Sequence, residues 1–353
     1  MGRTFRVQRI VSDTAIATIA RDGNWFAHRY DPEHDAVHFV RLSRNAHRAA
    51  TFLTDEYLPE GLEKIVLARQ AVVEATPPAN APHFIFHSAF CCSTLLARAF
   101  DLEGVSMGLK EPPIYNDIVG WKHRGGGPPA RIAQVLDHAT TLLARPLGVN
   151  ETAIIKPSNV ANGFAQGLLA MRPTSKALLL HAPLEVYLRS IAKKQIDGRL
   201  WVRDLLVKQL KDGLIDLGFT SEDYLRQTDL QVAAVGWLAQ HALFARLVEA
   251  FGPERVKTLD SEHLLDRPEA NLKALGRFFG LALSDDQTGT IVRGAAFHTH
   301  SKSQAAFGKQ QRTAEYDQAA SHHADEIGKA IVWATAVAQS AGVPMALGAS
   351  VRG

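Results

Sequence analysis

Residues 83–98, HFIFHSAFCCSTLLAR, decide the fold of this 353-residue chain. The first five residues form a short apolar run typical of a buried strand, and the stretch from Ser93 has the spacing and polar start of a helix. A strand, a tight turn and a helix in this order offer backbone N–H groups and a positive helix end to an anion. The hydroxyls of Ser93 and Thr94 add two donors, so the segment predicts an anion-binding junction.

This junction differs from an ordinary nucleotide-binding loop. The pattern G-x-x-x-x-G-K-[ST], aligned on Ser93, requires two glycines and a lysine just upstream. The chain has Phe86 and Cys91 at the glycine positions and Cys92 at the lysine position. We therefore do not expect a loop of the usual ATP- or GTP-binding type.

Further apolar runs follow at 153–155, 177–180 and 256–259, and helical patterns such as 184–194 lie between them. Short apolar strands that alternate with helices predict βαβ units and a parallel sheet. The expected fold class is therefore α/β, with helices flanking a parallel sheet.

Polar side chains stand where each expected strand ends, at His87, Lys156, His181 and Asp260. Ligands of parallel sheets bind beyond the carboxyl ends of the strands, so these side chains are expected to converge on one site. The alternative is that polar residues simply mark the ends of buried strands.

The region before this domain reads differently. Residues 1–80 form an expected accessory α+β region, with β-like runs at 15–19 and 36–42 and a helix around 62–74. The segment 77–80 reads as a linker, and residues 81–345 are expected to form the main domain.

The composition of the chain limits the classes of function that it can have. A net charge of +3 is too small for a typical nucleic-acid binder but suits attraction of small anions. The two cysteines, Cys91 and Cys92, are adjacent, which predicts no disulfide, a reducing compartment and no cysteine-based metal site. Because no apolar run is long enough to span a bilayer, we expect a cytoplasmic protein. Its oligomeric state stays open.

The segment 84–98 resembles the 5′-phosphosulfate loop of bacterial sulfotransferases, in which a strand precedes Arg/Lys-Ser-Gly-Ser/Thr-Thr-Leu-Leu. Residues 255–269 resemble the later pattern of that family, a strand followed by Glu-Asp-Leu and Asp-Pro, and Phe278-Phe279-Gly280 resembles its Phe-Leu-Gly. The similarity runs from about 83 to 315. It implies a P-loop NTPase-like fold. It also implies an enzyme that moves a sulfuryl group from 3′-phosphoadenosine 5′-phosphosulfate (PAPS) to a hydroxyl or amine of a small molecule.

The resemblance also implies roles for particular residues. Glu111, seventeen residues beyond Thr94, would be the general base, unless it is a loop carboxylate paired with Lys110. The loop cation of the family corresponds to Phe90, so Lys110, Lys156 or His87 would have to supply its charge. The residues expected to bind the donor are Ser88, Cys91, Cys92, Ser93, Thr94, His181, Arg189, Ser190, Lys302 and Arg312.

Two other functions remain open at this stage. One is a P-loop kinase, in which Ser93 or Thr94 and Asp260 would hold Mg²⁺ beside a nucleoside triphosphate. The other is a binding module that kept the fold without chemistry, which Phe90 suggests.

Overall fold

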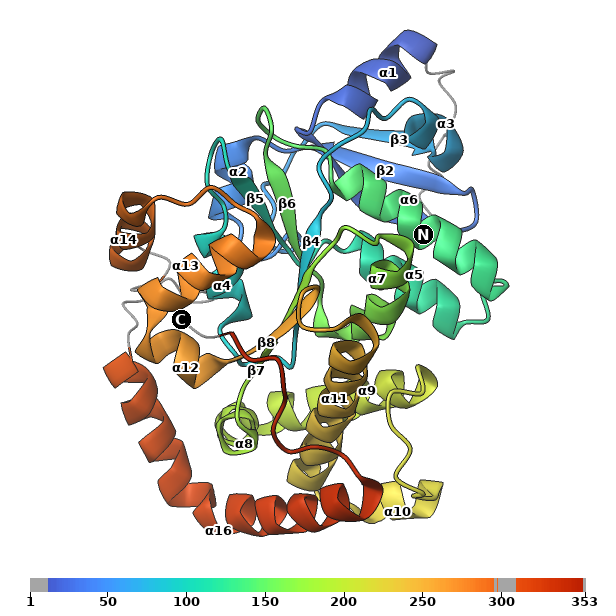
Figure 1. The fold of residues 1–353 in the computed structure, drawn as a ribbon. Helices are drawn as coiled ribbons and strands as arrows, with labels where there is room; N and C mark the ends of the chain where they lie inside the picture. The colour runs from blue at the N-terminus through green and yellow to red at the C-terminus, as the bar shows by residue number, and fades with distance from the viewer. Residues whose placement is uncertain (1–11, 295–296, 298–308, 352–353) are drawn as a thin grey trace.

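The computed structural model describes residues 12–294, 297 and 309–351, and within 309–322 the backbone alone. At its centre lies a five-stranded parallel sheet in the order β5-β6-β4-β7-β8 (Figure 1). This arrangement confirms the expected α/β class. The strands are β4 His83–His87, β5 Ser106–Lys110, β6 Thr152–Lys156, β7 Ala177–His181 and β8 Val256–Asp260.

Helices cover both faces of this sheet (Figure 1). One face carries α4 Ser93–Ala99, α12 Ser261–Asp266 and α13 Pro268–Phe279; the other carries α5 Ile114–His123, α6 Pro129–Leu143, the 3-10 turn η1 Asn159–Phe164, α7 Ala165–Met171 and α11 Asp229–Phe251. The backbone of α4 approaches β5 closely, because a Cβ on Gly108 would lie 1.9 Å from the carbonyl oxygen of Ala97. Only glycine fits there.

A second group of helices follows β7 and covers one end of the sheet (Figure 1). It contains α8 Leu184–Lys193, α9 Gln195–Lys211, α10 Ser221–Arg226 and α16 Lys309–Ala341. Outside this group, α14 Asp285–Arg293 packs against α13. Beyond α16 the chain returns to β8, where Thr258 donates to the carbonyl of Ala349 at 3.0 Å and accepts from the N–H of Val351 at 2.9 Å. Across the described residues, no helix combines the length and the apolar character that a membrane span requires.

Residues 12–76 contain a separate three-stranded antiparallel sheet and three helices. The strands are β1 Trp25–Asp31, β2 Ala36–Arg41 and β3 Lys64–Ala68, and the helices are α1 Asp13–Arg21, α2 Arg44–Ala49 and α3 Arg69–Glu74. This sheet packs on α5 and α6. Arg29 on β1 donates two hydrogen bonds, of 2.7 and 2.8 Å, to the carboxylate of Asp117 on α5. The buried Arg145, just beyond α6, donates to the carbonyl of Ile19 at 2.7 Å.

Two elements of the N-terminal region were predicted wrongly, and two strands of the chain, β1 and β5, were not predicted. Residues 15–19 are helical rather than extended, because the Ser12 side chain caps α1 by accepting from the N–H of Ala15 at 3.3 Å. The expected helix at 62–74 is β3 followed by the shorter α3, because the β-branched pair Ile65-Val66 pairs with β2. Strand β5 lacks β-branched and aromatic residues, which hid it.

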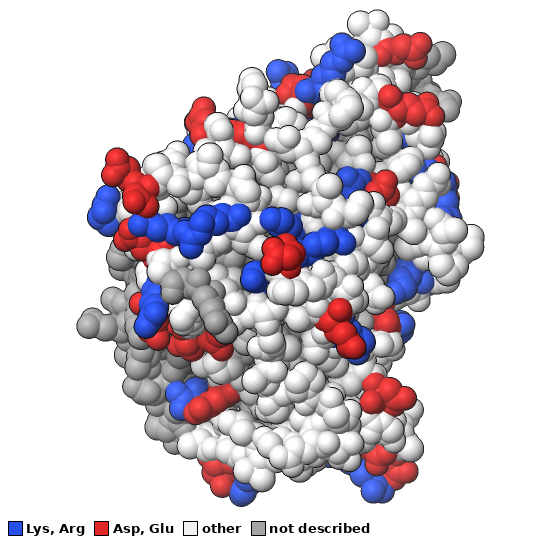
Figure 2. All heavy atoms as spheres, viewed as in Figure 1, with Lys and Arg blue, Asp and Glu red and all other residues white. Residues whose placement is uncertain are grey.

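Charges of both signs are interspersed on the face of the molecule in Figure 2, where Lys and Arg side chains form a band across the middle with carboxylates beside them.

Candidate functional site

Strand connectivity defines where a ligand should bind. From β4 the chain crosses to β5 at one edge of the sheet, whereas from β7 it crosses to β8 at the other edge. Because β4 and β7 are neighbours, their carboxyl ends form a topological switch point, the usual ligand position in open parallel sheets. The turn 88–92 begins at this point.

Ser88 fastens the two strand ends together. Its N–H donates to the carbonyl of Leu180 at 3.0 Å, and its Oγ accepts from the N–H of Ala182 at 3.1 Å. The residue is fully buried. Its hydroxyl, expected to bind the donor, is thus engaged with the protein backbone.

The turn has a strained backbone. Ala89, Phe90 and Cys92 have φ values of +70°, +51° and +62°. In this region a side chain with a Cβ crowds the following carbonyl oxygen, at about 1–2 kcal/mol per residue. Such strain persists only where surrounding contacts enforce it, and it concentrates at functional sites.

His87 enforces much of this geometry. The N–H of Ala89 donates to its Nδ1, and its Nε2 lies 3.1 Å from the carbonyl oxygen of Pro157. Nδ1 must therefore be unprotonated and Nε2 must carry the hydrogen, which describes a neutral imidazole. Both ring nitrogens of His87, a candidate for the missing charge, lie against backbone groups, and these contacts position the turn.

Two further side chains brace the turn from other elements. Asn162 on η1 donates to the carbonyl of His87 at 3.0 Å, and Gln240 on α11 donates to that of Ser88 at 3.3 Å. Asn162 and Gln240 also contact each other, and both are fully buried. No sequence pattern singled out either residue, because their relevance depends on how η1 and α11 pack.

The two cysteines of the turn differ in environment. Cys91 is buried and lies 3.4 Å from the carbonyl oxygen of Leu180, and desolvation raises the pKa of its thiol to about 12. It is a packed thiol, and only its backbone could face a ligand. Cys92 is partly exposed at the start of α4, directly before the largely buried Ser93 and Thr94.

Glu111 and Lys156 form an ion pair beside the turn. Lys156 ends β6 and Glu111 follows β5; the Nζ of Lys156 contacts Oε1 of Glu111, and the N–H of Glu111 donates to the carbonyl of Lys156 at 2.7 Å. The side chain of Lys156 is 1% exposed and that of Glu111 is 20% exposed. The carboxylate is therefore the member of the pair that solvent can reach.

Two neighbours complete the surroundings of this pair. His87 Nε2 lies 4.0 Å from Glu111 Oε1. The ring of Phe52, from the N-terminal region, has its centroid 5.4 Å from Lys156 Nζ, within reach of a cation–π contact. Ends of three adjacent strands, β4, β5 and β6, thus meet here, and residues 1–80 contribute to the site.

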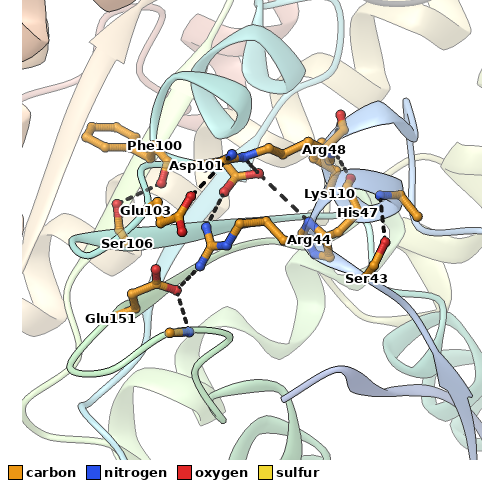
Figure 3. A network of polar contacts seen from close by, with 12 residues as sticks. Ser43, Arg44, His47, Arg48, Phe100, Asp101, Glu103, Ser106, Lys110 and Glu151 are labelled. Carbon is orange, nitrogen blue, oxygen red and sulfur yellow. Dashed lines mark hydrogen bonds and ion pairs between the residues drawn. The ribbon is translucent and has the colours of Figure 1, made fainter. Parts of the chain in front are cut away.

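Lys110 lies apart from this pair in its contacts. Its Nζ donates to the carbonyls of His47 at 2.7 Å and Arg48 at 3.2 Å at the end of α2, within the polar network of Figure 3. Desolvation lowers its pKa to about 8. The alternative in which Lys110 partners Glu111 was wrong, since Lys156 takes that place, and Lys110 joins α2 to β5 instead.

His181 also makes its contacts elsewhere. Its Nδ1 lies 3.9 Å from Asp260 at the end of β8, and its ring stands edge-on to that of His241 on α11 at 5.1 Å. Burial lowers the pKa of His181, so the neutral ring is favoured. His181 shares the sheet edge with the Glu111–Lys156 pair without contacting it.

The remaining expected donor ligands lie on helices or outside the described residues. Arg189 donates to Glu185 at 2.5 Å along α8, and the hydroxyl of Ser190 donates to the carbonyl of Val186 at 2.8 Å. Lys302 lies outside the described residues, and so does the side chain of Arg312 on α16. The two described cationic candidates, His181 and Arg189, therefore already face carboxylates.

No protein-family model matches the chain, and no curated protein matches it. Among solved structures, a sulfotransferase from Mycobacterium avium is similar over 70% of this chain and 77% of its own, with 10% sequence identity and a TM-score of 0.41.

Proposed function

We propose that this protein is a sulfotransferase-like enzyme that moves a sulfuryl group from PAPS to a hydroxyl or amine of a small molecule. One observation carries the proposal. Glu111, Lys156 and His87 meet from three adjacent strand ends, beside a strained turn at the switch point of a parallel sheet. A proton acceptor next to an anion-binding turn is what transfer to a hydroxyl requires.

In the proposed reaction the acceptor oxygen attacks sulfur, and the bond from sulfur to the bridging oxygen breaks. The electron pair of that bond stays on the bridging oxygen, which becomes part of the 5′-phosphate of adenosine 3′,5′-bisphosphate. The acceptor proton passes to Glu111, whose carboxylate is the exposed member of its ion pair. Atoms and charge balance without another reactant.

In the proposal, Lys156 connects the proton transfer to Glu111 with the negative charge that develops on the donor. While Glu111 is ionised, it neutralises the ammonium group beside it. Once Glu111 takes the proton, the charge of Lys156 is unbalanced in a buried setting, where a developing anion nearby is strongly favoured. His87 acts as a positioning residue by fixing the turn through Ala89.

Donor binding is divided between two places in the proposal. Ser93, Thr94 and the backbone of the turn, including Cys91 and Cys92, would hold the 5′-phosphosulfate. The 3′-phosphate would be bound by His181, Arg189, Ser190, Lys302 and Arg312. For Arg189 this requires exchange of the contact with Glu185, a partly exposed pair that costs little to break.

The test combines binding with turnover. Calorimetry with adenosine 3′,5′-bisphosphate, and with ATP plus Mg²⁺, would accompany sulfate-transfer assays against a metabolite extract. We expect the bisphosphate to bind wild type and Glu111→Gln alike, while Glu111→Gln loses about 10²–10⁴-fold in turnover. Glu103→Gln, a change at an exposed carboxylate before β5, should leave both unchanged.

Two outcomes would replace the proposal. Binding of ATP with Mg²⁺ in preference to the bisphosphate would favour the kinase alternative. Binding of the bisphosphate without turnover in any fraction would favour a non-catalytic module, for which the aromatic Phe90 in place of a cation is the supporting observation.

A further inference from the structure

The bridging oxygen of the donor needs a cation from the start of the proposed reaction, before Glu111 has taken the acceptor proton. Negative charge develops on the bridging oxygen, and a donor aimed at such a position supplies a large part of catalysis. The turn carries Phe90 where a cation is expected. The three candidates from the sequence are engaged before the reaction starts. Glu111 neutralises Lys156 until the acceptor proton has moved, Lys110 binds carbonyls, and both ring nitrogens of His87 bind backbone groups.

Another cation stands beside Phe90. Lys194 lies between α8 and α9, and its Nζ is 6.0 Å from the centroid of the Phe90 ring. The side chain is exposed, and no carboxylate in the described part of the chain pairs with it. Its charge is therefore available next to the turn.

Aromatic packing holds the α8–α9 junction, which carries Lys194, against the turn 88–92. Phe90 packs edge-on against Tyr187 of α8 and Trp201 of α9, with centroids 5.8 and 5.5 Å away, so both helices are fixed against the turn. At Gly198 an added Cβ would lie 2.8 Å from the Cβ of Lys194, so the backbone at the α8–α9 junction approaches α9 closely at this glycine.

We propose that Lys194 is the catalytic cation of this site, supplied from the α8–α9 junction in place of a loop residue. This inference rests on the proposed function. When the bond between sulfur and the bridging oxygen breaks, the Lys194 ammonium donates a hydrogen bond to that oxygen, and no proton needs to be transferred. The contact with the Phe90 ring is weak at an exposed site, so the flexible side chain can exchange it for the ligand.

The experiment moves the positive charge from position 194 to position 90. Variants Lys194→Met, Phe90→Lys and the double variant Phe90→Lys/Lys194→Met are compared with wild type, and Lys193→Met serves as a control with the same loss of charge one residue away. Phe90→Lys keeps the backbone cost of the turn, because both residues carry a Cβ at the same positive φ. Binding of inorganic pyrophosphate and of adenosine 3′,5′-bisphosphate is measured by calorimetry, and sulfuryl transfer is measured in parallel.

We expect Lys194→Met to weaken binding of both anions at least about tenfold and to reduce turnover about 10²–10³-fold. Lys193→Met should stay within about twofold of wild type on the same reasoning. The double variant should recover most of the loss, because it returns a cation to the turn.

The outcomes separate this inference from the proposed function. Transfer and binding that do not change in Lys194→Met would overturn the inference and leave the function standing. Anion binding that depends on Lys194, without any sulfuryl transfer, would make Lys194 an anion-binding residue and would overturn both its catalytic role and the proposed function. Failure of wild type to bind either anion would refute both.

Discussion

The ion pair between Glu111 and Lys156 makes a prediction about stability that does not depend on any substrate. Glu111→Ala would leave the ammonium group of Lys156 buried, at 1% exposure, with no carboxylate. Removing one member of a buried pair costs about 3–5 kcal/mol, because the remaining charge stays out of water. Lys156→Met leaves a carboxylate that is 20% exposed and can reach solvent, so we expect about 1–2 kcal/mol.

The assay is urea unfolding followed by fluorescence and circular dichroism together, with the free energy of unfolding compared among variants. The double variant Glu111→Ala/Lys156→Met removes both charges, and it should be more stable than Glu111→Ala alone. Glu103→Ala, at an exposed carboxylate, should change stability by less than about 0.5 kcal/mol. If Glu111→Ala costs no more than Glu103→Ala, Lys156 is not held as described.

Three other predictions concern the turn and its surroundings. Ala89→Gly should stabilise the protein by about 1 kcal/mol in urea unfolding, since glycine adopts the φ of +70° without strain, whereas Ala97→Gly within α4 should destabilise it. Lys110 has a pKa of about 8 in the folded protein against 10.5 ordinarily, so between these values the unfolded chain holds a proton that the folded one has released. Stability should therefore rise across this interval by up to about 3 kcal/mol relative to Lys110→Met; an identical pH profile of the two proteins would contradict the burial of Lys110. Iodoacetamide near pH 8 should modify Cys92 long before Cys91, whose pKa is raised to about 12; mass spectrometry showing equal labelling of the native protein would refute this.

The main sheet could be predicted from the sequence because its strands are short apolar runs bounded by polar residues. The expected strand 83–87 and the helix start at Ser93 agree with β4 and α4, and the runs at 153–155, 177–180 and 256–259 lie within β6, β7 and β8. Strands buried on both faces leave this uniform signal. The N-terminal errors arose where a side-chain cap on α1 and pairing with β2 outweighed local propensity.

The site could be predicted only in part. Polar strand ends identified His87 and Lys156 as candidates, and the family resemblance identified Glu111. Their proximity depends on β5, β6 and β4 being neighbours, and sequence order does not reveal that. The orientation of the His87 ring depends on the carbonyl of Pro157, seventy residues away in sequence. Lys194 lies on an exposed helix junction without any motif, and only the packing of Phe90 against α8 and α9 draws attention to it.

A crystal structure of the protein with adenosine 3′,5′-bisphosphate would test the proposed anion site most directly. The account predicts the 5′-phosphate at the turn 88–94, within hydrogen-bonding distance of its backbone N–H groups, with Glu111 and Lys156 next to the oxygen that would carry the sulfuryl group. A bisphosphate bound away from this turn, or a turn closed off by protein atoms at saturating ligand, would contradict it.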